Sequence, residues 1–308
     1  MARRYVTPIA FKTALEQRLP TSAQGMSSEM QRPRQQIVFD RFLARLVIAY
    51  QDDLVLKGGL ALELRLARAR TTKDIDLRLL GRSDETMVRL QEAGQLDLGD
   101  FFAFTVHPDP QHPEIEAEGM RYEGLRFRVE AELAGKVYGA AFGIDVAFAE
   151  PLAGEPELFT GRDYLSFAGI EPTKFHIYPI ETHIAEKLHA YTLPRNRPNS
   201  RVKDLPDLAL LGTIRPLEAT RLRRAMEHTF EHRKTHPLPE FLPRPLEIWA
   251  PVYQRMAEFD RLRWPTIDEV TAAVQAFLDP VLRGQLGTWQ PEAWQWTDRS
   301  SAGTFPNR

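Results

Sequence analysis

Two glycines and two aspartates form the pattern with the clearest chemical meaning in this sequence. Gly58 and Gly59 end a short apolar segment at residues 53–56, which predicts a turn whose backbone can approach a ligand closely. Asp74 and Asp76 alternate with apolar residues as in a strand, so both carboxylates project from one side, roughly 6 to 7 Å apart. Paired carboxylates supply half of an oxygen-ligand site for Mg²⁺, and the N–H groups of a glycine turn can bind a triphosphate. The pattern therefore predicts a site for a nucleoside triphosphate and a divalent cation.

A third acidic residue, Asp145, lies within an apolar strand candidate at residues 136–148. An unpaired buried carboxylate is costly, so this aspartate needs a partner. A cation shared with Asp74 and Asp76 would provide one, and we expect the three carboxylates to converge on one cleft. Three carboxylates beside a glycine turn are the groups that two-metal nucleotidyl transfer requires, with Mg²⁺ or Mn²⁺ as the cation. The glycine turn and the aspartate pair are each more often structural when they occur alone, and a lone Asp145 is structural about as often as it is a ligand. The three in this order favour a metal–nucleotide site.

The elements that must position these residues follow from hydrophobic periodicity. An amphipathic helix is predicted at 35–51, a loop or arm between short helices at 1–35, and a short helix after the glycines. The pattern further predicts a helix at 84–93, strands at 101–106, 121–133 and 136–148, and helices near 180–193, 204–212, 216–232, 245–260 and 267–284. The tail from Thr288 carries three tryptophans and should pack against another part of the chain. An α/β N-terminal half and a mainly helical C-terminal half are therefore predicted.

The helical half holds a second group of charged residues. Lys187 lies at the shoulder of an apolar helix face, where its ammonium can reach past the packed stem. The basic loop that follows contains four cations, namely Arg195, Arg197, Arg201 and Lys203. Arginine suits bidentate phosphate contacts, lysine suits a point-charge contact, and the loop has no aromatic residue on which a base could stack. We therefore expect this loop to bind phosphate groups, such as those of an RNA backbone, although a solvated loop is its ordinary structural explanation.

Three other polar residues of this half have structural explanations. Asp204 could be the N-cap of the next helix, with Pro206 in the first turn. His183 and His189 lie on the preceding helix, and a structural role is the better interpretation for each.

The order of these motifs resembles the DNA polymerase β-type nucleotidyltransferase superfamily. The finer pattern KGG…R-x-T-K-D-I-D, followed by A-E-K-L-H-A and R-x-K-D-L-x-D, resembles the AbiEii/MenT branch of toxins. The matching segments cover about residues 54–80, 140–150 and 180–211. The resemblance implies an α/β (α+β) fold, with a nucleotidyltransferase domain and helical arm at 1–165, built on a mixed β-sheet. It also implies a mainly helical domain at 166–308 that contributes to the active-site cleft.

The resemblance also implies roles for particular residues. Asp74, Asp76 and Asp145 would bind metal, and Asp145 would also orient or deprotonate the acceptor. Lys187 would neutralise charge on the triphosphate, and Asp204 matches a position needed for activity. The nucleotide-binding residues implied are Lys57, Gly58, Gly59, Arg70, Thr72 and Lys187. The sequence departs from the family at Leu60, where a serine or threonine hydroxyl usually helps to hold the triphosphate.

For this branch, the resemblance implies transfer of a nucleoside monophosphate from an NTP to the 3′ acceptor end of tRNA, which blocks aminoacylation. A cognate antitoxin protein is implied as a partner. A nucleotidyltransferase acting on a small molecule such as an antibiotic is an alternative, which the basic loop weakly disfavours. Leu60 keeps open a second alternative, a catalytically silent nucleotide-binding protein.

Composition narrows the class of protein. The chain has 308 residues, a hydrophobic content of 43% and a formal net charge of −2, as is ordinary for a globular protein with room for two domains. The absence of cysteine excludes disulfides, zinc–thiolate sites and cysteine catalysis. Residues 81–170 carry 7 basic against 17 acidic residues, which argues against a duplex-binding protein. No apolar run is long enough to span a bilayer and no secretory signal is evident, so we expect a cytoplasmic protein without membrane contact.

Overall fold

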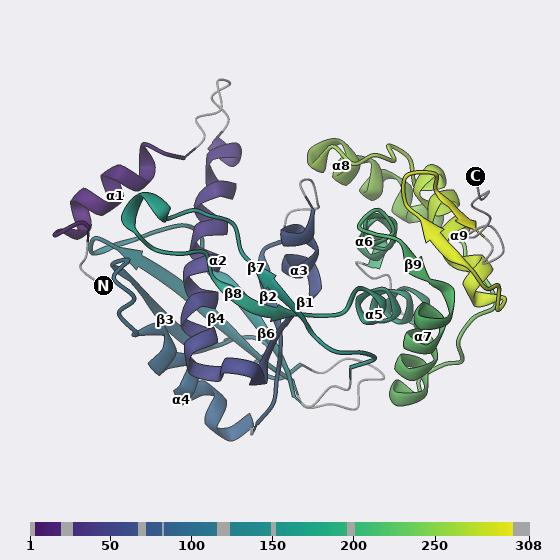
Figure 1. Cartoon of the computed structure of the whole chain (residues 1–308), viewed down its shortest axis with the longest axis horizontal. Coiled ribbons are helices and arrows are strands. Elements are labelled where there is room, and N and C mark those ends of the chain that lie inside the picture. Colours follow the sequence, from purple (N-terminus) through teal and green to yellow (C-terminus); the bar gives the residue numbers. More distant parts are fainter. Residues whose placement is uncertain are drawn as a thin grey trace, which may run out of the picture.

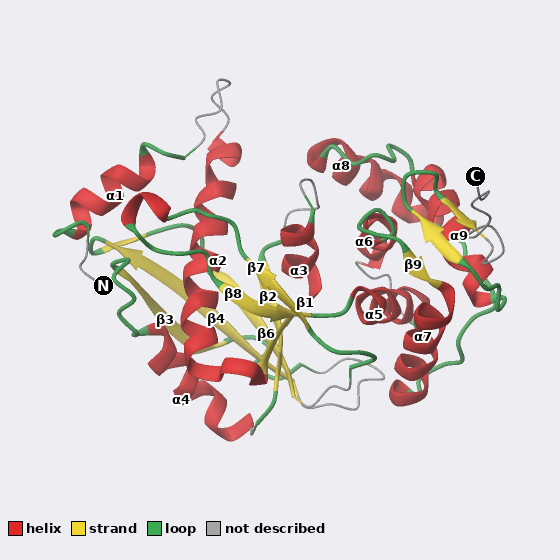
Figure 2. Ribbon diagram, in the orientation of Figure 1, coloured by secondary structure: helices red, strands yellow, loops and turns green. Residues whose placement is uncertain are grey.

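The computed structural model describes residues 4–19, 27–66, 72–81, 83–115, 124–148, 152–195 and 201–297. Two lobes lie side by side, a sheet with helices against it and a second lobe made mainly of helices (Figures 1 and 2). The predicted α/β class with a mixed sheet is confirmed.

The N-terminal lobe contains most of the strands and the longest helix. Its helices are α1 (Pro8–Glu16), α2 (Ser27–Tyr50), α3 (Gly58–Arg65) and α4 (Ser83–Gly94), with 3₁₀ turns η1 (Gln51–Asp53) and η2 (Ser166–Ala168). Its strands are β1 (Leu54–Lys57), β2 (Asp74–Leu79), β3 (Phe102–Pro108), β4 (Gly124–Leu133), β5 (Lys136–Val137), β6 (Phe142–Phe148), β7 (Glu157–Thr160) and β8 (Lys174–Ile177). The helix predicted at 35–51 is therefore the C-terminal part of a longer helix that begins at Ser27.

The sheet has the strand order β3-β4-β6-β2-β1-β8-β7, with β5 paired to β4. β2 runs parallel to β6 and β1 runs parallel to β8, while the other pairs are antiparallel. A hairpin turn at Ala134–Gly135 connects β4 and β5, and both residues have the positive φ angles of a tight turn. The mixed sheet thus places β2 at its centre, between β1 and β6.

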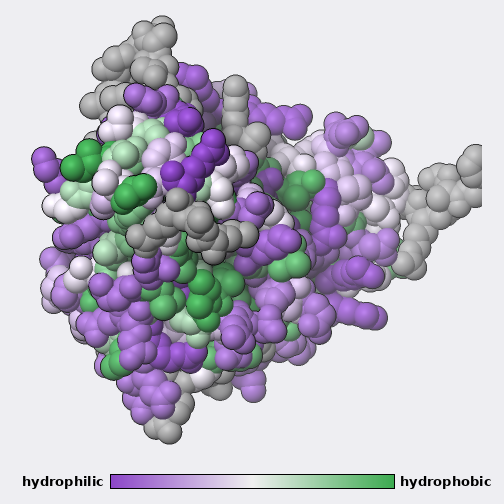
Figure 3. Space-filling model, turned by 60° about the vertical axis from the view of Figure 1, so that its left-hand side comes forward, coloured by the Kyte–Doolittle hydropathy of each residue, from purple (hydrophilic) through white to green (hydrophobic). Residues whose placement is uncertain are grey.

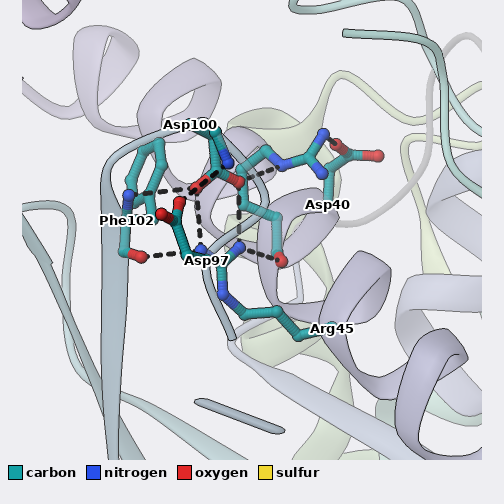
Figure 4. A network of polar contacts seen from close by, with 7 residues as sticks. Asp40, Arg45, Asp97, Asp100 and Phe102 are labelled. Carbon is teal, nitrogen blue, oxygen red and sulfur yellow. Dashed lines mark hydrogen bonds and ion pairs between the residues drawn. The ribbon is translucent and has the colours of Figure 1, made fainter. Parts of the chain in front are cut away.

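A buried ionic network fixes α2 against this sheet (Figure 4). The carboxylate of Asp100 accepts hydrogen bonds from Arg45 at 2.7 and 2.9 Å and from Arg41 at 2.9 Å. Arg45 and Asp100 are fully buried, and Arg45 also donates to the carbonyl of Phe102 at 2.6 Å. Helix α2 and the start of strand β3 are therefore joined by paired charges as well as by apolar contacts.

The C-terminal lobe is built from helices and one small sheet. Its helices are α5 (Ile180–Thr192), α6 (Asp204–Leu211), α7 (Ala219–Arg233), α8 (Ala250–Asp260) and α9 (Ile267–Leu282), with 3₁₀ turns η3 (Arg201–Lys203) and η4 (Glu247–Trp249). The small sheet has the order β11-β10-β9 and consists of β9 (Leu217–Glu218), β10 (Thr288–Gln290) and β11 (Gln295–Thr297). The tryptophan tail does pack inward, because Trp289 is fully buried and donates to the carbonyl of Gly212 at 2.7 Å.

Two hydrophobic cores correspond to the two lobes. The sheet core extends along the chain from Phe11 to Ile177, and the helical core extends from Ile180 to Trp289 with Leu62 added from α3. β8 lies after the boundary predicted at residue 165 and still belongs to the large sheet, so the change of core comes between Ile177 and Ile180. Sequence periodicity also missed β7 and β8, which are only four residues long.

The surface is mainly hydrophilic on the face drawn in Figure 3, with a hydrophobic area towards its centre. None of the helices in the described ranges is both long and apolar enough to cross a membrane.

Candidate active site

The three predicted carboxylates lie on one face of two neighbouring strands. β2 and β6 pair in parallel with Asp76 opposite Asp145 and Asp74 opposite Gly143. Partners in a parallel ladder project to the same side, and residues two apart on a strand share a face. The register therefore brings Asp74, Asp76 and Asp145 to the same face of the sheet.

The glycine turn lies directly against the central carboxylate. Gly58 has a φ of +65°, and a Cβ atom there would lie 2.0 Å from Oδ2 of Asp76. The N–H of Gly59 donates to the same oxygen at 3.3 Å. Because only glycine allows both the positive φ and this close approach, the turn and the aspartate form one unit.

Gly143 plays a similar part at the other aspartate, and sequence reasoning assigned it no role. Its N–H donates to Oδ1 of Asp74 at 3.2 Å, and a Cβ atom at Gly143 would lie 2.7 Å from that oxygen. A glycine inside an otherwise apolar strand often marks a close approach, which was the available signal.

Asp145 has an ion-pair partner that sequence reasoning also missed. Nε and Nη2 of Arg126 on β4 donate to the two carboxylate oxygens of Asp145 at 2.6 and 2.8 Å. β4 and β6 place Arg126 opposite Asp145, a long-range register that local periodicity cannot supply. Among the residues that the structure describes, no group of three or more histidines and acidic residues is arranged to hold a metal ion.

Asp74, Asp76 and Asp145 define what we call the acidic face of the sheet. Neighbouring groups shift the pKa of Asp76 on this face. Burial, followed by the charge of Asp145, raises the pKa of the Asp76 carboxyl. The ammonium groups of Lys187 and Lys57 and the N–H of Gly59 act in the opposite direction on that pKa. Lys187, on a helix of the other lobe, is thus electrostatically coupled to Asp76.

Lys187 is held by two buried carboxylates. Its Nζ lies 2.8 Å from Oδ2 of Asp207 and 3.2 Å from Oδ1 of Asp204, and both aspartates are fully buried. Arg201 lies 3.5 Å from the other oxygen of Asp204. The suggestion that Asp204 is an N-cap is wrong, because α6 begins at Asp204, the N-cap is Lys203, and the carboxylate turns to Lys187 instead.

Lys57 faces the helical lobe. Its Nζ lies 3.2 Å from Oε1 of Glu186 on α5 and 5.0 Å from the centre of the Tyr178 ring. Arg233 on α7 lies 3.4 Å from the same glutamate oxygen. Glu186 therefore ties the end of β1 to two helices of the second lobe.

Leu60 and Thr72 have local structural roles. Leu60 is buried in the sheet core, so its side chain faces away from any ligand at the turn. Thr72 donates through its hydroxyl to the carbonyl of Asp74 at 3.2 Å, and its N–H donates to buried Glu63. These contacts fix the start of β2.

The remaining predicted residues are only partly described. Arg70 and Arg197 lie outside the described residues. Arg195 ends one described segment, and Arg201 and Lys203 belong to η3 immediately before α6. Two of the four predicted RNA-contacting cations are therefore placed beside Asp204.

The two histidines of α5 lie in buried surroundings. Burial, followed by the charge of Lys187, lowers the pKa of His183 to about 3, so this side chain is neutral at ordinary pH. Nε2 of His189 lies 2.8 Å from the hydroxyl of Thr235, and Nδ1 lies 3.3 Å from Arg233. Thr235 and Arg233 both belong to the helical lobe.

The fold has known counterparts. MenT4, a nucleotidyltransferase toxin from Mycobacterium tuberculosis H37Rv, aligns with a TM-score of 0.57 and 18% identity, covering 97% of this chain and 96% of MenT4. JHP933 from Helicobacter pylori aligns with a TM-score of 0.41 and 16% identity, over 64% of this chain and 75% of that protein. The antibiotic-resistance factor ANT(2'')-Ia gives 0.37 and 18%, over 66% and 94%. Among these three, the likeness to MenT4 has a TM-score high enough to show a shared fold.

The sequence itself matches a protein family over residues 41–293. That family is described as the nucleotidyl transferase AbiEii toxin of a type IV toxin–antitoxin system. No curated protein sequence matches the chain. The family match spans both lobes and all of the motifs described above, and the chain therefore belongs to the AbiEii family of nucleotidyltransferase toxins and is a nucleotidyltransferase.

Proposed function

We propose that this enzyme transfers a nucleoside monophosphate from an NTP to the 3′-terminal hydroxyl of tRNA and thereby blocks aminoacylation. The acceptor oxygen attacks the α-phosphorus, the bond from that phosphorus to the oxygen bridging to the β-phosphate breaks, and pyrophosphate leaves. The observation that carries the proposal is the register of Asp76 opposite Asp145, with the Gly58–Gly59 turn against Asp76 and Lys187 acting on the same carboxylate.

A divalent cation, Mg²⁺ or Mn²⁺, fits this acidic face. Carboxylate oxygens are the ligands that these cations prefer, and the mutual repulsion of Asp76 and Asp145 is what a cation would offset. Asp74, Asp76 and Asp145 would hold the cation, which when bound neutralises the triphosphate and lowers the pKa of an attacking hydroxyl.

The protein groups would then divide the remaining work. Asp145 would orient the acceptor hydroxyl and take its proton, and Lys187 would neutralise charge that develops on the phosphates. Asp204 and Asp207 would fix the ammonium of Lys187 in position. The turn residues Gly58 and Gly59 would hold the triphosphate. Lys57, Arg70 and Thr72, which lie near them in the sequence, would also bind the nucleotide. The RNA backbone would be contacted by the four cations of the basic loop, namely Arg195, Arg197, Arg201 and Lys203. Their positive charges suit contacts to phosphate groups, which carry no base sequence information.

The direct test supplies Mg²⁺, each NTP labelled at the α-phosphate, and either total tRNA or an aminoglycoside. Label should enter tRNA, and Asp76→Asn or Lys187→Ala should lower the rate by on the order of 10²-fold or more. Lys174→Ala, an exposed lysine on β8, is the matched control and should retain activity. Label in the aminoglycoside alone would replace the tRNA assignment with a small-molecule one.

Growth provides a second readout. The toxin–antitoxin setting of the family implies an antitoxin partner. Expression without that partner should arrest growth, and Asp74→Ala or Lys187→Ala should relieve the arrest. Equal arrest by the wild type and both variants would separate toxicity from nucleotidyl transfer.

A further inference from the structure

Arg126 uses both oxygens of the carboxylate that the proposed function assigns to the cation. Its two donors form a fork with Asp145 at 2.6 and 2.8 Å. The side chains of Arg126 and Asp145 are 34% and 26% exposed, so solvent and ions can reach the pair. A divalent cation and this guanidinium cannot both occupy the same face of the carboxylate.

The surroundings of Arg126 are acidic on several sides. The carboxylates of Asp145, Asp109 and Asp74 raise the pKa of the Arg126 guanidinium, with Asp145 making the largest contribution. Its backbone is fixed, because its N–H donates to the carbonyl of Pro113 and its carbonyl accepts from the N–H of Asp109, at 2.8 and 2.9 Å. Release of Asp145 therefore requires only rotation of the arginine side chain, with no shift of β4.

We propose that Arg126 is an exchangeable counter-ion of Asp145, which occupies the carboxylate when no cation is bound and competes with the divalent cation for it. This inference rests on the metal site of the proposed function. Arg126 is then a positioning residue, and it sets the concentration of divalent cation at which the carboxylates of the acidic face bind the ion.

The test measures Mn²⁺ binding directly, from the free Mn²⁺ signal in electron paramagnetic resonance at constant ionic strength and without nucleotide. Arg126→Gln should bind Mn²⁺ roughly tenfold more tightly, because a charge-assisted fork no longer competes. Arg126→Lys retains the charge but not the fork and should fall between the wild type and Arg126→Gln.

Arg128→Gln is the matched control. Arg128 lies two residues further along β4 on the same face, opposite Gly143, and is exposed. Its removal subtracts the same charge near the same carboxylates, so it measures the general electrostatic effect, which should be less than about threefold. Thermal unfolding of each variant shows that the fold is retained.

A double-mutant cycle assigns the effect to the pair. In an Asp145→Asn background, Arg126→Gln should no longer tighten Mn²⁺ binding, because the competed carboxylate is absent. Equal affinities of Arg126→Gln and Arg128→Gln, with binding weakened by Asp76→Asn, would overturn the competition while leaving the metal site intact. Binding that neither Asp76→Asn nor Asp145→Asn weakens would overturn the metal site, and the competition with it.

Discussion

Two glycines set the geometry of the candidate site at the scale of single residues. Gly58 lies against Asp76, whose carboxylate accepts a hydrogen bond from the N–H of Gly59. Gly143 lies against Asp74 and donates to its carboxylate through its own N–H. A side chain at either position would enter the space of an aspartate oxygen. The two glycines therefore leave the space that the oxygens of Asp76 and Asp74 occupy.

Gly58→Ala should abolish nucleotidyl transfer while leaving a folded protein. The methyl group would lie 2.0 Å from Oδ2 of Asp76, so the aspartate or the turn must move, in addition to the cost of about 1 kcal/mol for alanine at positive φ. Gly135→Ala is a matched control, since Gly135 has a φ of +68° and no atom within 4 Å of its Cβ position. Transfer rates and urea unfolding would be compared. Similar losses of activity in both variants would show that backbone strain alone is responsible.

The phase of the carboxylates could be predicted from the sequence, whereas their partners could not. The alternation of Asp74 and Asp76 with apolar residues is local information, and β2 has the predicted period. Arg126 meets Asp145 only through the pairing of β4 with β6, and Asp207 meets Lys187 only through the packing of α6 against α5. Both contacts depend on long-range register, on which a single sequence carries no direct signal.

At the scale of elements, α2 is joined to the sheet through Asp100 (Figure 4). Asp100 accepts hydrogen bonds from Arg41, Arg45 and the N–H of Phe102, and it is fully buried. An ion pair of this kind stabilises little relative to an apolar replacement, but removal of one member leaves buried charge uncompensated.

Asp100→Ala should lower the free energy of unfolding by about 3 to 5 kcal/mol, since two buried guanidinium groups lose their carboxylate. Asp52→Ala is the control, because the Asp52 side chain is 96% exposed and an exposed pair contributes at most about 1 kcal/mol. Equilibrium urea unfolding followed by circular dichroism would give both values. A loss below about 1 kcal/mol for Asp100→Ala would mean that water or rearranged side chains satisfy the arginines.

Short elements were the part of the fold that sequence patterns could not predict. β7 and β8 have four residues each, which is too few for alternation to be recognised. β8 nevertheless pairs in parallel with β1 and so lies beside a strand of the candidate site. The long helices α5, α7 and α9 were predicted within a few residues, because their apolar stripes repeat over several turns.

At the scale of the whole molecule, α3 belongs to both cores. Leu60 and Ala61 pack into the sheet core, whereas Leu62 packs into the helical core, and α3 lies between the two lobes in Figure 1. The same helix begins with the glycine turn at Asp76. The element that carries the candidate nucleotide-binding turn thus packs into both lobes, and it should couple their stability.

Leu62→Ala should uncouple the unfolding of the lobes. The Leu62 side chain is 1% exposed, and truncation of a buried leucine lowers the free energy of unfolding by about 2 to 5 kcal/mol. This loss would weaken the helical core and its contact with α3. All five tryptophans lie between Trp249 and Trp296, so their fluorescence reports on the C-terminal lobe alone, whereas circular dichroism reports on both lobes.

In the wild type, the two signals should give the same urea midpoint, as expected when the lobes unfold together. In Leu62→Ala, the fluorescence midpoint should fall below that of circular dichroism, because the helical lobe now unfolds first. Leu43→Ala is the comparison, since Leu43 is equally buried but belongs to the sheet core. That variant should not lower the fluorescence midpoint below the circular dichroism midpoint. Coincident midpoints in Leu62→Ala would show that α3 does not carry the coupling, and the ion pair between Lys57 and Glu186 would then be the next contact to remove.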